Sequence, residues 1–279
     1  MTQWQLAHGR QIELGARALL MGILNVTPDS FSDGGEFSER DRAVEHARRM
    51  ASEGADIIDV GGESTRPGAT PVSAHEEQAR ILPVIEALAG DGNFVISVDT
   101  YRAETARLAV AAGAHIVNDV HGVQREPDVA RLAAETGAGL VIMHTGRDRQ
   151  RLPDVIADEF LFLRKSLEIA RQEGVADAQI VLDPGFGFAK RSEENLQLMA
   201  RFGELRALGF PLLVGTSRKR LLTDIEGGDK KARDAGTAAT SVILRLKGAA
   251  IFRVHNVAAN RDALAFADAM LEREKVLGR

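Results

Sequence analysis

The sequence predicts an α/β protein in which eight strands alternate with eight helices in a (β/α)8 barrel, preceded by an N-terminal β-hairpin. Eight short apolar runs recur along the chain, and stretches with helical spacing of apolar residues separate them. The chain has 279 residues, and one such barrel typically needs ~250 residues. No shift in composition marks a boundary, so we expect one domain over residues 1–279.

The predicted strands are nearly continuous apolar runs, which is typical of parallel strands buried on both faces. They lie near residues 18–26, 55–62, 94–99, 115–120, 139–144, 179–183, 211–216 and 249–255. The predicted helices lie near residues 39–53, 74–89, 102–112, 127–136, 154–173, 192–207, 232–247 and 258–275. The main predicted loops are 27–37, 62–73, 145–153 and 223–234, all on the side where strands end. Residues 3–14 predict a hairpin, with His8 and Gly9 at its turn, that covers one end of the barrel.

The composition is that of a globular protein, with 44% hydrophobic and 27% charged residues. The net charge of -5 argues against a nucleic-acid binder, which usually has a basic surface. The chain has no cysteine, and this excludes disulfides, zinc–thiolate sites and cysteine nucleophiles. It shows neither a signal-peptide pattern nor an apolar run of about 18 residues. We therefore expect a cytoplasmic protein that does not bind membranes.

Each apolar run ends in a polar or charged residue, and in such barrels the functional site lies at the carboxyl ends of the strands. Taken singly, these residues have ordinary explanations: Asp99 would cap the next helix, and Asp183 would form a turn with Pro184 and Gly185. Taken together, they predict one polar site. Its members at the strand ends are Asn25, Glu63, Thr65, Asp99, Asn118, His144, Asp183, Lys219, Arg253 and His255.

Three consecutive cations, Arg218, Lys219 and Arg220, follow the seventh predicted strand and open a helix that Ser217 would cap. Cations are electrostatically misplaced at a helix N-terminus, so the cluster predicts a bound anion. Arg253 and His255, two residues apart on the eighth strand, share one face and lie next to it. Phosphate groups commonly bind after these two strands. A solvated basic surface is the alternative.

Other motifs narrow the chemistry. The Gly-Phe-Gly-Phe segment at 185–188 lacks the third glycine of a dinucleotide fingerprint. It predicts close approach of a flat ligand, with Phe188 available to stack. No cluster of histidines and carboxylates has transition-metal spacing. Mg2+ held by one or two protein oxygens and by substrate phosphates stays open, and Asn25 would supply such an oxygen.

Two long stretches resemble the signatures of dihydropteroate synthases: 21–35 (MGILNVTPDSFSDGG) and 55–69 (ADIIDVGGESTRPGA). Segments 97–100, 118–120, 183–188, 217–219 and 253–255 are similar to the remaining blocks of that family, in the same order. The resemblance covers nearly the whole chain. Residues 144–147, Ala189 and Asn256 depart from it, since the family commonly has Met-His-Met-Gln-Gly, Gly and Asp there.

The resemblance implies an enzyme that joins a dihydropterin diphosphate to 4-aminobenzoate, releasing diphosphate and forming 7,8-dihydropteroate. It implies that the pterin is held by Asp99, Asn118, Asp183 and Lys219. The diphosphate and Mg2+ would be held by Asn25, Arg253 and His255. The aminobenzoate would be ordered by a mobile loop with Thr65, Arg66 and Pro67, in a pocket lined by Phe188, Ser217 and Lys219. Asp33 would help to stabilise a pterin cation. The family also suggests a homodimer and competition by sulfonamides.

Three other functions remain open at this point. A pterin-binding methyltransferase barrel would share the pterin-binding residues, but it has no use for a diphosphate site. A Schiff-base aldolase would use Lys219 as the nucleophile. A catalytically silent pterin-binding paralogue would not need the aminobenzoate loop at 65–67.

Overall fold

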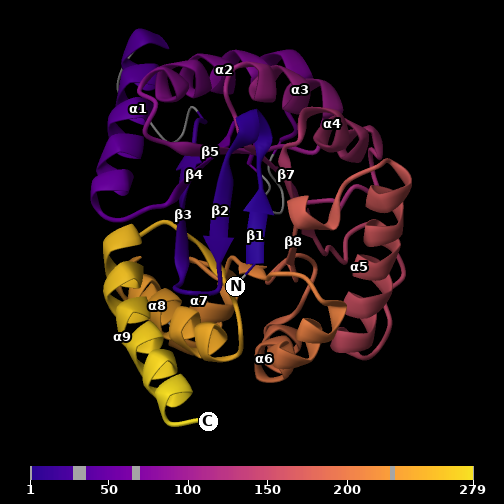
Figure 1. Cartoon of the computed structure of the whole chain (residues 1–279), viewed down its shortest axis with the longest axis vertical. Coiled ribbons are helices and arrows are strands. Elements are labelled where there is room, and N and C mark those ends of the chain that lie inside the picture. Colours follow the sequence, from indigo (N-terminus) through magenta and orange to yellow (C-terminus); the bar gives the residue numbers. More distant parts are fainter. Residues whose placement is uncertain (1, 28–35, 65–69, 227–229, 279) are drawn as a thin grey trace.

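Eight parallel strands form a nearly closed barrel, and helices surround it. The computed structural model describes residues 2–27, 36–64, 70–226 and 230–278. The strand order is β8-β7-β6-β5-β4-β3-β10-β9, and a parallel bridge between Leu182 and Leu212 links the two ends of this sheet. The predicted (β/α)8 barrel is thus confirmed, and Figure 1 shows the ring of helices around it.

The elements follow one another as the apolar runs predicted. The barrel strands are β3 Leu19–Asn25, β4 Ile57–Gly61, β5 Val95–Asp99, β6 Ile116–Asp119, β7 Gly139–Met143, β8 Ile180–Asp183, β9 Leu213–Val214 and β10 Ile251–Val254. The helices are α1 Glu36–Ser52, α2 Ala74–Gly90, α3 Ala103–Ala111, α4 Asp128–Thr136, α5 Val155–Gln172, α6 Ser192–Arg201, α7 Arg220–Glu226, α8 Lys230–Leu246 and α9 Val257–Val276. Short 3-10 helices are η1 Ala7–Gly9, η3 Asp177–Gln179 and η4 Phe202–Leu208. Within the described ranges, no helix combines the length and the apolar character needed to cross a membrane.

The predicted helical stretch 192–207 is present as α6, which continues directly into η4 after Arg201. The prediction of a loop over 223–234 was wrong. The segment 223–234 is mostly helical, since α7 reaches Glu226 and α8 begins at Lys230. The buried Leu221 and Leu222 anchor the short α7 on the protein interior.

The interior of the barrel changes character along its axis. Every second residue of a strand points to the same side. One inward layer is apolar and consists of Met21, Ile57, Ile116, Val141, Val181, Leu213 and Ile251. Two residues further along four of these strands, the inward positions carry Asp59, Asn118, Asp183 and Arg253. The barrel is therefore dry at the start of its strands and polar at their carboxyl ends.

The N-terminal hairpin closes the apolar end of the barrel, as the sequence predicted. Strands β1 Thr2–Gln5 and β2 Gln11–Leu14 pair antiparallel through η1 and lie across the ring in Figure 1. Trp4 is 1% exposed and belongs to the apolar cluster of the barrel interior. Its indole Nε1 donates a hydrogen bond to the carbonyl oxygen of Gln179 at 2.7 Å. The hairpin leaves the opposite end of the barrel as the place for a site.

Replacing Trp4 with Ala should lower the free energy of unfolding by ~3–5 kcal/mol, the usual cost of removing a large buried aromatic side chain. Chemical denaturation followed by circular dichroism measures this. Gln3→Ala is the matched control, because Gln3 lies in the same strand with its side chain exposed. Equal midpoints for the two variants would show that the hairpin does not stabilise the barrel.

Candidate active site

A cavity of about 1690 Å³ opens at the carboxyl ends of the barrel strands. Its lining includes the predicted site residues Asn25, Asp99, Phe188, Ser217, Lys219, Arg253 and His255. Asn118 and Asp183 occupy inward positions of β6 and β8 and are only 3% and 5% exposed. The predicted residues Asp33, Thr65, Arg66 and Pro67 lie outside the described residues. The barrel mouth therefore brings together the described residues predicted to hold the substrates, and Glu63 also lines it. The strand-end residue His144, in contrast, is fully buried outside this lining.

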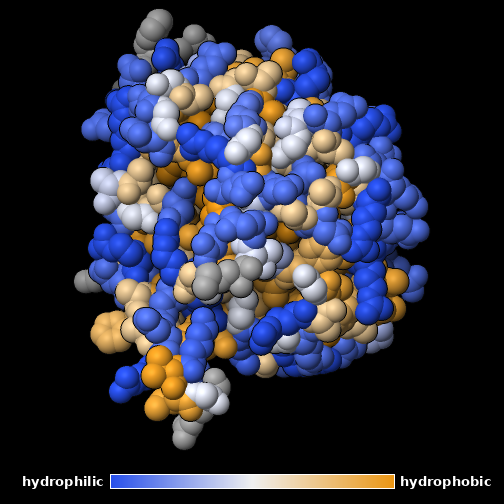
Figure 2. All heavy atoms as spheres, viewed as in Figure 1, coloured by the Kyte–Doolittle hydropathy of each residue, from blue (hydrophilic) through white to orange (hydrophobic). Residues whose placement is uncertain are grey.

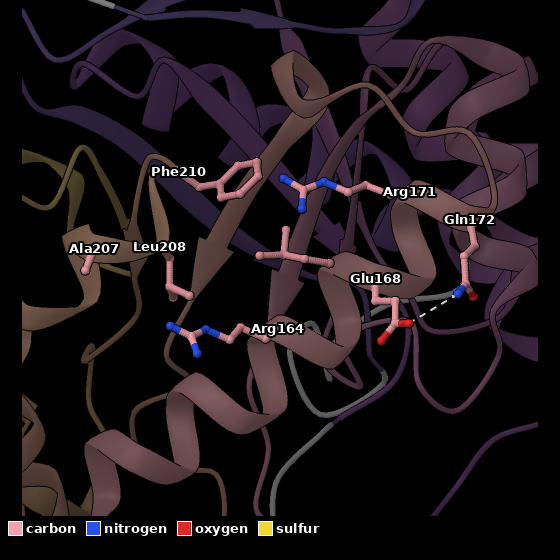
Figure 3. A pocket seen from close by; sticks show the side chains of 8 residues that line it. Arg164, Glu168, Arg171, Gln172, Ala207, Leu208 and Phe210 are labelled. Carbon is pink, nitrogen blue, oxygen red and sulfur yellow. Dashed lines mark hydrogen bonds between the residues drawn. The ribbon is translucent and has the colours of Figure 1, made fainter.

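A second hollow, of about 590 Å³, lies on the outside of the barrel between α5 and the end of η4. Figure 3 shows that Arg164, Arg171 and Phe210 flank it, while Glu168 and Gln172 are hydrogen-bonded to each other. Arg171 is paired with Asp177 at 3.0 Å. The charged groups here are exposed and do not converge. The cavity at the barrel mouth is thus the better candidate for chemistry.

Arg253 lies between two carboxylates inside the barrel mouth. Its Nε donates to Asp59 Oδ2 and its Nη2 to Asp99 Oδ2, each at 2.6 Å. Asn118 Nδ2 donates to the same oxygen of Asp59 at 3.3 Å. Asp99 does not cap the next helix, because the residue before α3 is Arg102 and it makes no side-chain cap. Asp99 and Asn118 thus belong to a charged network that spans strands β4, β5, β6 and β10.

Asp59 is a site residue that the sequence analysis missed. It is fully buried, and its Oδ1 has no hydrogen-bond partner among the described residues. The signal was present, since Asp59 is the one charged residue inside the apolar run 57–61. It lies two positions before the strand end and so points inward with Ile57. Asp59 was not predicted because only the residues at the strand ends were taken as candidates.

Burial in this network shifts the protonation of its members. Burial raises the pKa of Asp99 to about 7, with Asp59 adding to the rise and Arg253 opposing it. Burial acts to lower the pKa of Arg253, but Asp59 and Asp99 outweigh it and hold that pKa above its usual range. The guanidinium stays charged, whereas Asp99 exchanges its proton near neutrality.

Asp183 shapes the loop that follows β8. Its Oδ1 accepts a hydrogen bond from Gly185 N at 2.7 Å, so the turn predicted from the sequence is present. Gly185 has a φ of +60°, and a Cβ there would lie 2.0 Å from the carbonyl oxygen of His144. Only glycine fits this approach. Burial raises the pKa of Asp183, and the nearby Lys219 opposes the rise.

Lys219 reaches the same loop from the other side. Its Nζ donates to the carbonyl oxygen of Phe186 and lies 4.5 Å from the centre of the Phe188 ring. The guanidinium of Arg147 lies 4.8 Å from that ring centre. Burial lowers the pKa of Lys219 to about 7, although Asp183 opposes the fall. Phe188 is therefore a flat surface of the cavity with two cations against it.

The two flanking arginines have other partners. Arg218 pairs with Asp234 at 2.7 Å, while Arg220 is 91% exposed and lies 3.6 Å from Asp224. Asn256, one of the departures from the family pattern, donates to Asp234 at 3.0 Å and also caps α9. An aspartate at 256 could not donate that bond. Arg218, Lys219 and Arg220 all line the cavity. Although they are adjacent in the sequence, each has a different partner.

Ser217 is not the helix cap that the sequence predicted, because α7 begins three residues later, at Arg220. Its hydroxyl oxygen accepts a hydrogen bond from His255 N at 3.1 Å and lies 2.9 Å from His255 Nδ1. Ser217 thus joins the end of β9 to the end of β10. This contact fixes the orientation of the His255 ring at the cavity wall.

The described residues contain no group of three or more histidines, aspartates and glutamates that could hold a metal ion. Asn25, half-buried at the end of β3, lines the cavity and carries a neutral amide oxygen. Such a donor suits Mg2+ that takes most of its ligands from water and phosphate. The donor set therefore fits a magnesium ion brought with a phosphorylated substrate.

Comparison with known proteins places the chain among pterin-using enzymes. Residues 21–255 match the family described as "Pterin binding enzyme". The dihydropteroate synthase of Clostridium beijerinckii is 43% identical over 95% of this chain and 98% of its own length. A dihydropteroate synthase from Clostridium difficile, solved with pteroic acid, has a TM-score of 0.90 and 43% identity over 93% of this chain and 98% of its own. The enzyme of Xanthomonas albilineans, solved with 4-aminobenzoic acid, has a TM-score of 0.90 and 42% identity over 97% and 99%.

Lys219 should become reactive toward an amine-selective acylating reagent as the pH rises through about 7. Its lowered pKa means that the neutral, nucleophilic amine appears well below the ~10.4 usual for lysine. Trace labelling at a series of pH values, with peptide mass spectrometry, measures this. The exposed Lys165 of α5 is the internal reference. If both lysines gain reactivity over the same pH range, burial does not lower the pKa of Lys219.

Proposed function

Because the chain belongs to the dihydropteroate synthase family of pterin-binding enzymes, we propose that it is a transferase of an alkyl group. It joins (7,8-dihydropterin-6-yl)methyl diphosphate to 4-aminobenzoate and yields 7,8-dihydropteroate and diphosphate in folate biosynthesis. The observation that carries this proposal is the cavity in which Asp99, Lys219, Arg253 and His255 meet beside the Phe188 ring.

The pterin is proposed to bind deepest, against Asp183, Asn118, Asp99 and Lys219. The amino-pyrimidinone edge of a pterin offers N–H donors, which suit a buried carboxylate such as Asp183. It also offers a carbonyl acceptor, which suits the Lys219 ammonium. A buried polar site of this kind selects its ligand strongly, because a ligand that lacks these groups leaves the protein's own groups unpaired.

The diphosphate is proposed to lie against Arg253, His255 and Asn25. Arg253 is held in place by Asp59 and Asp99, so its position requires no rearrangement as charge develops. His255 is held by Ser217. Mg2+ bound at Asn25 would add positive charge beside the leaving group.

The reaction is proposed to be dissociative. The C–O bond to diphosphate breaks first, and the positive charge spreads into the electron-rich pterin. Asp33 is proposed to stabilise this cation, and the loops at 27–37 and 62–73 to exclude water. The aryl amine attacks while neutral, so no strong base is required. Thr65, Arg66, Pro67, Phe188, Ser217 and Lys219 are proposed to receive the aminobenzoate, where sulfonamides would compete.

A homodimer is proposed through α8 and α9. Ile243 and Leu246 of α8 are 42% and 40% exposed, and Phe266 and Met270 of α9 are 83% and 43% exposed. Figure 2 shows hydrophobic side chains gathered near the C-terminal end of α9. Exposed apolar side chains on adjacent helices are typical of a protein interface. A monomeric mass in sedimentation equilibrium would refute this.

We also propose a cytoplasmic, single-domain protein without nucleic-acid partners, in line with the net charge of -5.

The purified protein with Mg2+ should convert the dihydropterin diphosphate and 4-aminobenzoate into dihydropteroate and diphosphate. Product formation is measured by chromatography, and diphosphate by a coupled assay. Omission of 4-aminobenzoate is the control that separates transfer from hydrolysis. Absence of both products would overturn the proposal.

The lowered pKa of Lys219 also suits Schiff-base chemistry. Failure to trap a substrate on Lys219 with borohydride excludes the aldolase alternative.

Lys219→Ala should weaken pterin binding by roughly tenfold or more, because it removes a charged donor from a buried site. Turnover should fall with it. Calorimetry with the pterin alone and steady-state kinetics measure the two effects. Lys165→Ala is the control, since Lys165 is exposed on α5. Wild-type affinity and kinetics for Lys219→Ala would remove Lys219 from the site.

A further inference from the structure

A second buried lysine lies beneath the loop that follows β8, outside the roles assigned above. The side chain of Lys190 is 1% exposed, and those of Glu159 and His144 are fully buried. Lys190 Nζ lies 3.1 Å from Glu159 Oε1 and 2.7 Å from His144 Nδ1. Glu159 comes from α5, and His144 directly follows β7. Lysine and glutamate are rarely buried this deeply unless they are paired, and a buried pair is weak evidence for stability.

The Lys190 ammonium gathers main-chain carbonyls of the loop. It donates to the carbonyl oxygens of Pro184 at 2.8 Å and of Gly185 at 3.1 Å. These carbonyls directly follow Asp183. Within seven residues the loop contains three positive φ angles, +60° at Gly185, +80° at Gly187 and +52° at Ala189. Such a backbone forms few regular hydrogen bonds. Gly185 O also accepts from Phe188 N at 3.1 Å, whereas Lys190 is the donor to Pro184 O. The buried ammonium therefore orients the first carbonyls of the loop.

His144 is oriented to accept from this lysine. Burial lowers the pKa of His144 to about 3, so its ring is neutral at physiological pH. Its Nε2 lies 3.0 Å from Asp158 Oδ2 and 2.8 Å from Arg149 Nη2. The Lys190 ammonium, 2.7 Å from Nδ1, can only donate, so the proton of the neutral ring is placed on Nε2, toward Asp158. Nδ1 is then left as an acceptor for Lys190. His144, the strand end for which the sequence offered no role, thus helps to fix the position of the ammonium.

Glu159 lies beside both of the other groups. Its Oε1 is 3.1 Å from Lys190 Nζ and 3.3 Å from His144 Nδ1, while neither carboxylate oxygen meets the angular criteria of a hydrogen bond within the described residues. Burial raises the pKa of Glu159 and lowers that of Lys190, while each group opposes the shift of the other. An apolar pair of similar volume would satisfy packing alone.

We propose that Lys190 is a positioning residue for the reaction, because its ammonium fixes the loop 184–188 and thereby the Asp183 carboxylate and the Phe188 ring. Glu159 is its counter-charge, and His144 its acceptor on the barrel side. The proposal rests on the proposed function, since Asp183 and Phe188 act there on the two substrates. Asn195 supports the same loop by accepting from Gly187 N at 2.8 Å and donating to the Lys190 carbonyl oxygen at 3.1 Å.

The test removes the charge pair without leaving a buried charge. The double variant Glu159→Leu/Lys190→Met should still fold, because no charge is left buried. It should melt below the wild-type temperature, because His144 Nδ1 and the Pro184 carbonyl lose their donor. Its affinity for 6-hydroxymethyl-7,8-dihydropterin, measured by calorimetry, should fall about tenfold or more through loss of a charged donor to the loop. The KM for the pterin diphosphate should rise accordingly. Lys247→Met is the matched control, because Lys247 Nζ also donates to a carbonyl oxygen, that of Ala200, but on the surface.

Wild-type pterin affinity in a folded double variant would overturn the proposal, since the pair would then serve stability alone. If the double variant does not fold, Glu159→Gln/Lys190→Gln decides, because it removes both charges and keeps polar groups at both positions. Its pterin affinity should fall about tenfold or more, and wild-type affinity there would also overturn the proposal. The calorimetric measurement needs no turnover. Failure of the proposed function is seen separately, as absence of dihydropteroate formation by the wild-type protein.

Discussion

The guanidinium of Arg253 makes the polar half of the barrel possible. It lies 2.6 Å from both Asp59 and Asp99, carboxylates that approach from different strands. Closure of the barrel forces every second side chain inward, so neither acid can turn away to solvent. Two uncompensated carboxylates at this depth would cost several kcal/mol each. One cation held between them fixes β4, β5 and β10 at the level where a ligand would lie.

Two buried lysines are likewise stabilised by neighbouring carboxylates at other positions around the barrel. Lys219 lies near Asp183, and Lys190 lies beside Glu159. In each case burial works against the charged form and the neighbouring charge works for it. The pKa values of Asp99 and Lys219 therefore lie near 7, far from those of the free amino acids. The protonation of Asp99 and Lys219 is thus balanced between burial and neighbouring charge, whereas Arg253 stays charged.

The sequence predicts the barrel well because buried parallel strands leave unmistakable apolar runs. It predicts the residues at the strand ends for the same reason, since the run stops where the site begins. The sequence does not reveal where a side chain points. Arg218 and Arg220 were therefore predicted to bind an anion together with Lys219, although they form ion pairs with Asp234 and Asp224. Nor does the sequence reveal that Lys190 is buried, because this lysine follows a glycine-rich turn that resembles any solvated loop. Asp59 could have been found, since it is a charge inside an apolar run.

The hairpin covers one end of the barrel with Trp4, and within the part of the chain that the structure describes the cavity lies at the other end. A molecule bound at the bottom has no exit behind it. A second molecule bound nearer the mouth would block its path to solvent. The deeper molecule could then dissociate only after the outer one had left. Binding and release would thus be ordered by the depth of the two positions in the cavity.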